Sequence, residues 1–281
     1  MLLRLGTRRF DVSERPIVIG ILNRTRDSFF DRGAHFELDR LMARAEQLVA
    51  DGADVLEVGA RPGGVGVGDV PPDREMDLAA ESIAALRSRF DVPLAVETTR
   101  AAVARAAFAE GAVLGNDMSG FLDPAYLPAA AEAGAAVVAT HIRKPPGVPD
   151  PDPVYTDLLG EVCSRLSALA RAAEEAGIDR GGIVVDPGID LGKSWQQSLQ
   201  LLGRHTDIAA LGFPLLLAVS NKIFLRRALG LGDEALDVAT AAACALGAMR
   251  GGSVVRVHDA RGRQAADPAY ALRAAGSSPA R

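Results

Sequence analysis

Charged and amide side chains follow several short apolar segments of the sequence, where they could form one site. Arg256 and His258 stand two residues apart at the end of such a segment, so both would lie on the same side of it. A guanidinium and an imidazole suit an anion such as phosphate or pyrophosphate. Asn23 ends another segment and could lend its amide oxygen to a Mg²⁺ ion held on a pyrophosphate. These residue types predict a site for a phosphorylated small molecule.

Three further segments end in side chains that carry oxygen atoms, namely Glu97, Asn116 and Asp186. Carboxylate and amide oxygens accept hydrogen bonds, and a carboxylate can take a bidentate pair from the edge of an amino-pyrimidine. Lys222, near the end of another segment, can donate to a carbonyl oxygen. Together these groups suit a flat heterocycle that is rich in N–H donors.

The elements that would position these residues are eight apolar runs separated by alanine-rich helical patterns. Each run is continuously apolar rather than alternating, which is typical of parallel strands covered on both faces. Leucine and alanine repeats at helical spacing lie between the runs, for example over 41–49, 158–173 and 236–246. The eight runs are residues 17–23, 55–59, 94–98, 112–117, 135–141, 182–188, 214–220 and 253–259.

Eight β/α units in a chain of 281 residues predict an α/β fold, a TIM (β/α)8 barrel of one domain. The alternative is a doubly wound open sheet, but that fold would want a GxGxxG turn after its first strand, and "GILNRTRD" lacks one. In a barrel the carboxyl ends of the strands form the active-site face. Every run ends in polar groups: Asn23, Glu57, Glu97, Asn116 with Asp117, His141, Asp186, Ser220 with Lys222, and Arg256 with His258.

The barrel itself is predicted over residues 17–270. Residues 1–16 are expected to form an N-terminal extension or a short hairpin that closes the barrel floor. Residues 271–281, which include the final "AAGSSPAR", are predicted to form a flexible tail. For Glu57, two interpretations stay open: it orients the following loop through a backbone N–H, or it is a strand-end carboxylate satisfied by its neighbours.

Composition excludes several classes of partner. A net charge of −5 offers no basic face for nucleic acid. No apolar run reaches the roughly 18 residues of a membrane span, and the N-terminus lacks a secretory signal. The two cysteines, Cys163 and Cys244, are expected to be buried in a reducing compartment, and the four histidines have no zinc-like spacing. We therefore expect a cytoplasmic protein that binds neither nucleic acid nor membrane.

Five motifs, in this order and within barrel spacing, are similar to those of one family. They are "GILNRTRDSFFDRG", "GNDMSG", "VVDPGIDLGK", "SNK" and "VVRVHD". The sequence resembles the dihydropteroate synthases, which are pterin-binding TIM barrels, over about residues 16 to 260. It looks closer to a divergent actinobacterial branch of paralogues, which shares the "NRT…DSF…D" first loop and "SNK".

The resemblance implies a transferase of folate biosynthesis. It would condense 6-hydroxymethyl-7,8-dihydropterin pyrophosphate with p-aminobenzoate and release pyrophosphate, using Mg²⁺ and acting as a homodimer. It implies that Glu97, Lys222 and Asn23 are catalytic and that Asn23 serves the metal. The implied pterin contacts are Glu97, Asn116, Asp186 and Lys222, and the implied pyrophosphate contacts are Asn23, Arg256 and His258.

The second loop departs most clearly from the family pattern, which is glycine-glycine-glutamate-serine-threonine-arginine-proline-glycine. Here the sequence is "VGARPGGVGVGD". In one alignment Arg61 begins the family's arginine-proline-glycine after a short deletion. In the other, without a gap, Gly63 and Gly64 replace the threonine and arginine. Both alignments lack the serine-threonine pair that helps to seat pyrophosphate and p-aminobenzoate.

Other single positions also depart from the family pattern, at Glu97 in the pterin site and at several rim positions that handle the second substrate. Glu97 stands where the family has aspartate, Arg26 where proline is usual, and Asn221 where arginine is usual. Leu191 occupies the position of an aromatic residue that packs against the aniline ring, so the expected acceptor contacts are Leu191, Ser220 and Arg61. The acceptor is thus p-aminobenzoate or a related arylamine. The alternative is a divergent paralogue that binds pterin with weak or no synthase activity, and a methyl-transfer barrel fits less well.

Overall fold

Eight parallel strands form one ring in the computed structural model, which describes residues 1–13, 15–25, 37–62, 70–230, 232, 235–260 and 267. The hydrogen-bonded order is β8-β7-β6-β5-β4-β3-β10-β9. A parallel bridge between Val185 and Leu215 closes the ring, and the amide of Val185 donates to Pro214 O at 2.9 Å. The strands are β3 (Ile17–Asn23), β4 (Val55–Gly59), β5 (Leu94–Glu97), β6 (Leu114–Asp117), β7 (Ala136–Thr140), β8 (Ile183–Asp186), β9 (Leu216–Leu217) and β10 (Val254–Val257).

This ring confirms the predicted barrel. Each of the eight apolar runs contains one of the eight strands, and every neighbouring pair is parallel. The open-sheet alternative is wrong, because an open sheet would leave the two outermost strands unconnected, and here β8 and β9 meet.

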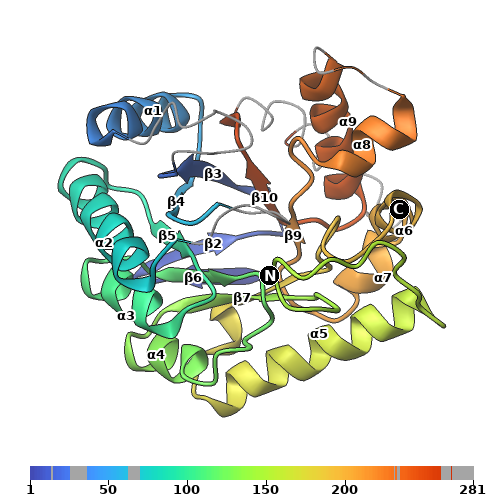
Figure 1. The fold of residues 1–281 in the computed structure, drawn as a ribbon, viewed down its shortest axis with the longest axis horizontal. Helices are drawn as coiled ribbons and strands as arrows, with labels where there is room; N and C mark the ends of the chain where they lie inside the picture. The colour runs from blue at the N-terminus through green and yellow to red at the C-terminus, as the bar shows by residue number, and fades with distance from the viewer. Residues whose placement is uncertain are drawn as a thin grey trace, which may run out of the picture.

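The helices surround this ring on its outer side (Figure 1). Their apolar faces explain the arrangement: Leu41, Ala45 and Leu48 recur at helical spacing and are fully buried. The helices are α1 (Leu38–Ala50), α2 (Pro72–Arg89), α3 (Ala101–Ala109), α4 (Tyr126–Glu132), α5 (Leu158–Glu175), α6 (Trp195–Gly203), α7 (His205–Ala209), α8 (Ile223–Leu229) and α9 (Leu236–Met249), with a 3₁₀ turn at Arg180–Gly182.

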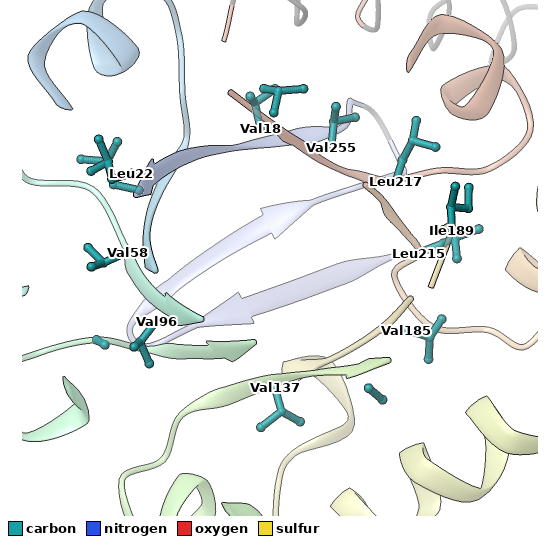
Figure 2. Packing of buried hydrophobic residues seen from close by; sticks show 14 of the residues in the cluster. Val18, Leu22, Val58, Val96, Val137, Val185, Ile189, Leu215, Leu217 and Val255 are labelled. Carbon is teal, nitrogen blue, oxygen red and sulfur yellow. The ribbon is translucent and has the colours of Figure 1, made fainter. Parts of the chain in front are cut away.

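The strands carry two apolar surfaces because successive side chains point to opposite faces. One set, which includes Val58, Val96 and Val185, points outward and packs against the helices (Figure 2). The other set fills the interior of the barrel and includes Ile17, Ile19, Val55, Ala95, Leu114, Ala136, Val138, Val184, Leu216, Ala218 and Val254. The interior is therefore a packed core in its lower part.

An antiparallel hairpin of β1 (Leu2–Leu5) and β2 (Arg8–Asp11) lies across this interior set. Leu3, Leu5 and Val12 are almost completely buried and belong to the same inner cluster as Ile17 and Val254. The hairpin thus packs on the amino-terminal end of the barrel strands. The predicted tail, 271–281, lies outside the described residues. Among the helices that the structure describes, none has the length and apolar character to span a membrane.

Candidate active site

The inward-facing series of each strand continues, in steps of two residues, to a polar side chain at the carboxyl end. On β5, for example, Ala95 is followed by Glu97, and on β10, Val254 is followed by Arg256 and His258. The same parity brings the predicted strand-end residues to one mouth of the barrel: Asn23, Glu57, Glu97, Asn116, Asp186, Ser220, Arg256 and His258.

A charged network joins four of these strand ends. Arg256 donates from Nε to Oε1 of Glu57 at 2.6 Å and from Nη2 to Oε2 of Glu97. Asn116 donates from Nδ2 to the other oxygen of Glu57, Oε2, at 2.9 Å. Strands β4, β5, β6 and β10 are thus tied together by side chains at the mouth.

Because this network is buried, its charged groups interact strongly and their pKa values shift. Burial raises the pKa of Glu57, and the nearby Glu97 adds to the rise, although Arg256 and Asn116 oppose it. Burial by itself would lower the pKa of Arg256, but the two carboxylates outweigh that effect and raise it. Arg256 is therefore a permanent cation between two carboxylates.

A second pair, Asp186 and Lys222, lies at the ends of β8 and β9. The backbone N–H of Gly188 donates to Oδ1 of Asp186 at 2.7 Å, and Nζ of Lys222 donates to the carbonyl of Ile189 at 3.1 Å. Burial raises the pKa of Asp186 and lowers that of Lys222, while each group's charge favours the charged form of the other. The two side chains therefore form an acceptor and a donor in one buried environment.

Ser220 and His258 are joined directly. The backbone N–H of His258 donates to Oγ of Ser220 at 3.3 Å, and the same hydroxyl lies 3.0 Å from Nδ1 of the His258 ring. Burial lowers the pKa of His258 to about 3, and the cations of Arg256, Lys222 and Arg44 act in the same direction. The ring is therefore neutral at pH 7, and its Nδ1 shares a hydrogen bond with the Ser220 hydroxyl.

The loop after β8 is held by a buried lysine. Nζ of Lys193 lies 3.0 Å from Nδ1 of His141 and donates to the carbonyls of Gly188, Leu191 and His141 at 2.9, 3.0 and 3.3 Å. The side chain of Leu191, a predicted acceptor contact, is half-buried on this loop. Lys193 therefore holds the loop together, whereas the following helix is capped by Ser194.

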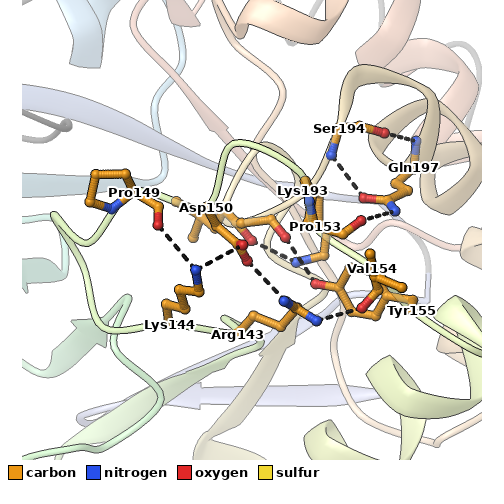
Figure 3. A network of polar contacts seen from close by, with 12 residues as sticks. Arg143, Lys144, Pro149, Asp150, Pro153, Val154, Tyr155, Lys193, Ser194 and Gln197 are labelled. Carbon is orange, nitrogen blue, oxygen red and sulfur yellow. Dashed lines mark hydrogen bonds and ion pairs between the residues drawn. The ribbon is translucent and has the colours of Figure 1, made fainter.

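A second loop, between β7 and α5, packs against this one (Figure 3). Asp150 accepts from Nε of Arg143 at 2.9 Å and pairs with Nζ of Lys144 at 3.1 Å. The hydroxyl of Tyr155 donates to Gly192 O at 3.0 Å, and Gln197 donates to Pro153 O at 2.8 Å. These bonds join the two loops that follow β7 and β8 into one wall at the mouth.

The amino-acid sequence matches a family described as "Pterin binding enzyme" over residues 19–258, a range that contains every residue predicted for the site. The chain belongs to the dihydropteroate synthase family. This confirms the resemblance that the five motifs indicated.

The relatives include one that is named a dihydropteroate synthase and one that is named an inactive one. Dihydropteroate synthase of Bacillus subtilis strain 168 is 35% identical over 249 residues, which cover 88% of this chain and 85% of that protein. "Inactive dihydropteroate synthase 2" of Mycobacterium leprae is 38% identical over 253 residues, covering 88% and 87%. The second match agrees with the predicted likeness to a divergent actinobacterial branch.

One relative is much longer than this chain. A probable bifunctional folylpolyglutamate synthase/dihydropteroate synthase of Haloferax volcanii is 39% identical over 86% of this chain. The matched region spans 29% of that protein.

Solved structures of the family have the same fold. The Yersinia pestis dihydropteroate synthase, crystallised with a sulfonamide drug, superposes with a TM-score of 0.92 at 32% identity and covers 98% of this chain and 100% of that one. The Xanthomonas albilineans enzyme with 4-aminobenzoic acid gives a TM-score of 0.87 at 33% identity, covering 99% of each chain.

Two arginines that sequence reasoning missed fix the bases of the family's first two loops on α2. Arg24, directly after β3, donates to Ser82 and to Glu81 at 2.9 Å each. Arg100 donates at 2.6 Å to Glu75 and at 2.8 Å to the carbonyl of Val70. Arg61, a predicted acceptor contact, is half-buried at the start of the second loop. Arg26 and the glycine-rich residues 63–69 lie outside the described residues.

Two other residues at the strand ends do not face the interior of the barrel. Asp117 points to the helix side, where it accepts from the backbone N–H groups of Ser119 at 2.7 Å and Phe121 at 3.0 Å. At the end of β7 the inward-facing residue is Thr140, which is 1% exposed, whereas His141 turns to Lys193. Among the described residues, the hydroxyl of Thr140 has no hydrogen-bond partner.

Proposed function

We propose that this chain condenses 6-hydroxymethyl-7,8-dihydropterin pyrophosphate with p-aminobenzoate or a related arylamine and releases pyrophosphate. The observation that carries the proposal is the shared mouth of the barrel. There Asn116, Asp186 and Lys222 lie beside the paired Arg256 and Glu97. The reaction breaks the C–O bond to pyrophosphate and forms a C–N bond to the amine. The site must therefore hold a heterocycle, a leaving anion and an acceptor.

The pterin is assigned to Glu97, Asn116, Asp186 and Lys222. The carboxylates and the amide oxygen would accept from the N–H groups of the ring, and the ammonium of Lys222 would donate to its carbonyl. Asp186 and Asn116 are buried, so these hydrogen bonds would form away from water. There they discriminate most strongly between a ligand with matching N–H donors and one without them. Glu97 would also lie near the positive charge that develops as pyrophosphate departs.

Pyrophosphate is assigned to Arg256, His258 and Asn23. Arg256 would supply charge, while His258, which is neutral, would supply hydrogen bonding only. Arg256 faces inward on β10, and His258 follows the end of that strand two residues later, so both would face a bound anion.

Mg²⁺ is assigned to Asn23. A β-carbon added at Gly59 would lie 3.4 Å from Oε2 of Glu97 and 3.7 Å from Oδ1 of Asn23, so glycine keeps the space beside these two oxygens open. Oxygen ligands of this kind fit Mg²⁺, which usually takes few protein ligands and completes its shell with water and phosphate oxygens. No group of three or more His, Cys, Asp or Glu side chains suited to a metal occurs in the described part of the chain. Mg²⁺ bound there would neutralise charge on the leaving pyrophosphate.

The acceptor is assigned to the rim formed by Leu191, Ser220 and Arg61. Leu191 is aliphatic and would pack on an aromatic ring without stacking. Its loop is held by Lys193 through the Leu191 carbonyl. An arylamine with a substituent different from that of p-aminobenzoate is compatible with this rim.

A second candidate function is pterin binding without turnover. It is favoured by the second loop, which lacks the family's serine-threonine pair, and by the likeness to a relative that is named inactive. The strongest argument against it is the anion site, since a protein that only binds pterin does not need Arg256 and His258 together.

We further propose a cytoplasmic homodimer that forms through α8 and α9. These two helices lie side by side (Figure 1). Large apolar side chains are exposed on both: Ile223 and Leu229 on α8 by 51% and 58%, and Val238 and Met249 on α9 by 73% and 48%. Large apolar side chains that are exposed on two neighbouring helices favour association with another surface. The V238E variant would then sediment as a monomer.

The test is pyrophosphate release from 6-hydroxymethyl-7,8-dihydropterin pyrophosphate with Mg²⁺, with and without p-aminobenzoate. Release that requires p-aminobenzoate would establish the synthase and exclude the binding-only candidate. Release that does not depend on p-aminobenzoate would indicate that the acceptor site differs from that of the family. A panel of other arylamines would then be tested. Binding of the pterin by calorimetry without any release would overturn the synthase proposal in favour of the second candidate.

A further inference from the structure

The carboxylate of Glu57 differs from its neighbours in being sealed from solvent. Its side chain is 0% exposed, whereas those of Arg256 and Glu97 are 14% and 18% exposed. A ligand that enters the mouth can therefore reach Arg256 and Glu97 but not Glu57. The contribution of Glu57 must act through the side chains that it touches.

Both oxygens of Glu57 are occupied by side chains of the proposed site. Oε1 accepts from Nε of Arg256 at 2.6 Å, and Oε2 accepts from Nδ2 of Asn116 at 2.9 Å. A buried carboxylate is costly unless such donors satisfy it, so each of these bonds is strongly favoured.

The bond to Asn116 fixes which end of that amide faces Glu57. If the amide turned over, Oδ1 would meet a carboxylate oxygen, and two acceptors would repel one another. The amide nitrogen is therefore held on the Glu57 side, and the carbonyl oxygen is directed away from it. Asn116 then selects an N–H donor of the heterocycle at this position and disfavours a ring acceptor.

The bond to Arg256 fixes the guanidinium independently of Glu97. Glu97 also accepts from Nη2 of Arg256. Ring N–H groups that bind Glu97 would compete with that contact. Glu57 cannot be reached by the same ligand, so it would keep Arg256 oriented through Nε while Nη2 becomes available to an anion.

We propose that Glu57 is the positioning residue of this site: it sets the acceptor end of Asn116 toward the heterocycle and holds Arg256 for the leaving anion. This inference rests on the proposed function, because it takes Asn116 and Arg256 as ligand contacts. The proposal can also be tested on the protein without ligand, because the hydrogen bond to Glu57 should protect the Nε–H of Arg256 from exchange with water.

The first experiment compares E57Q with E75Q by calorimetry of 6-hydroxymethyl-7,8-dihydropterin pyrophosphate. Glu75 is a matched control, since it is also 0% exposed and accepts from an arginine, Arg100, and from a neutral donor, Thr98. A glutamine at position 57 has one acceptor oxygen for two donors, so we expect E57Q to weaken binding at least about tenfold. E75Q should stay within about twofold. Equal losses in the two variants would overturn the proposal.

Two further variants separate positioning from general damage. E57D keeps the charge and should recover part of the affinity that E57Q loses. In an N116A background, E57Q should cost clearly less than in the wild type, because one of its two routes of action is already absent. Additive losses, or no rescue by E57D, would contradict the inference.

The ligand-free protein provides an independent readout. The Arg256 Nε–H resonance, identified by its absence in R256K, should exchange slowly with water in the wild type and in E75Q, and rapidly in E57Q. If the wild type fails to bind the pterin while this signal behaves as expected, the proposed function fails and the positioning of Arg256 by Glu57 stands. If exchange is unchanged in E57Q, the positioning role itself is wrong.

Discussion

Nζ of Lys193 and Nδ1 of His141 lie 3.0 Å apart, although the two residues belong to different loops at the mouth of the barrel. Burial lowers the pKa of His141 to about 3, and the Lys193 charge adds to that effect, so the ring is neutral. The same Nζ lies within hydrogen-bond distance of three carbonyls, so its N–H groups are shared among four acceptors, and burial lowers its pKa to about 7. This one side chain therefore ties the loop that carries Leu191 to the end of β7.

Replacing Lys193 by methionine should destabilise the protein by about 2–4 kcal/mol. The variant keeps the length of the side chain but leaves the carbonyls of Gly188 and Leu191 without their buried donor. Urea unfolding measures the change. The control is K144M, because Lys144 is 41% exposed and its ion pair with Asp150 should be worth less than about 1 kcal/mol. Similar losses in both variants would show that the buried contacts of Lys193 add nothing.

Gly115 on β6 leaves room for the ring of Tyr126 on α4. A β-carbon at Gly115 would lie 2.6 Å from the Tyr126 hydroxyl oxygen and 3.0 Å from Cζ of Phe108, so G115A should cost about 1–3 kcal/mol. The hydroxyl of Tyr126 is buried and has no hydrogen-bond partner among the described residues, so Y126F should be neutral or stabilising by up to about 1 kcal/mol.

The double variant G115A/Y126F decides whether this contact is the cause. Removing the hydroxyl removes the atom nearest to the new methyl group, so thermal or urea unfolding should show that most of the G115A loss is recovered. Strict additivity of the two changes would contradict the packing argument and point to Phe108 instead.

The barrel was predictable because continuous apolar runs and their spacing report burial on both faces of parallel strands. The site was predictable in part. Side chains alternate between the two faces of a strand, so the series that points into the barrel can be followed to the polar residue at the strand end. The end of β7 shows the limit: the run was read to His141, but the strand ends at Thr140, and a shift of one residue exchanges the inward and outward faces.

Partners that are distant in the sequence were the other limit. Of the two interpretations of Glu57, the structure supports a satisfied carboxylate, but its partner Arg256 is 199 residues away. Likewise, nothing in the local pattern around Arg24 indicates Ser82, which is 58 residues away and on a helix. The spacing of residues along one strand predicts on which face each side chain lies. Contacts between the ends of different strands can be inferred only when it is known that the strands close into a ring.

Acid should destabilise the protein in part through His205. This side chain is fully buried on α7, and burial lowers its pKa from 6.5 to about 4. Below pH 6.5 the unfolded chain gains a proton at His205 that the folded protein does not take up, so stability falls as the pH drops from 6.5 toward about 4.

The H205Q variant isolates this contribution because all other titrating groups are unchanged. Between pH 6.5 and about 5, the wild type should lose about 2 kcal/mol more than H205Q in urea unfolding. Parallel pH profiles for the two proteins would mean that His205 titrates equally in the folded and unfolded states.

Gly59 provides the sharpest test of the assigned metal and pyrophosphate contacts. Alanine at this strand position needs no unusual backbone angle, and its methyl group would make ordinary contacts with Glu97 at 3.4 Å and Asn23 at 3.7 Å. G59A should therefore fold with a change of less than about 1 kcal/mol. The methyl group would nevertheless fill the space beside the two oxygens, so the Mg²⁺ concentration for half-maximal pyrophosphate release should rise about tenfold or more.

The matched control is G203A, whose added carbon meets no heavy atom within 4 Å, and which should leave the Mg²⁺ dependence unchanged. A Mg²⁺ dependence in G59A equal to that of the wild type would contradict the assignment of the metal to Asn23.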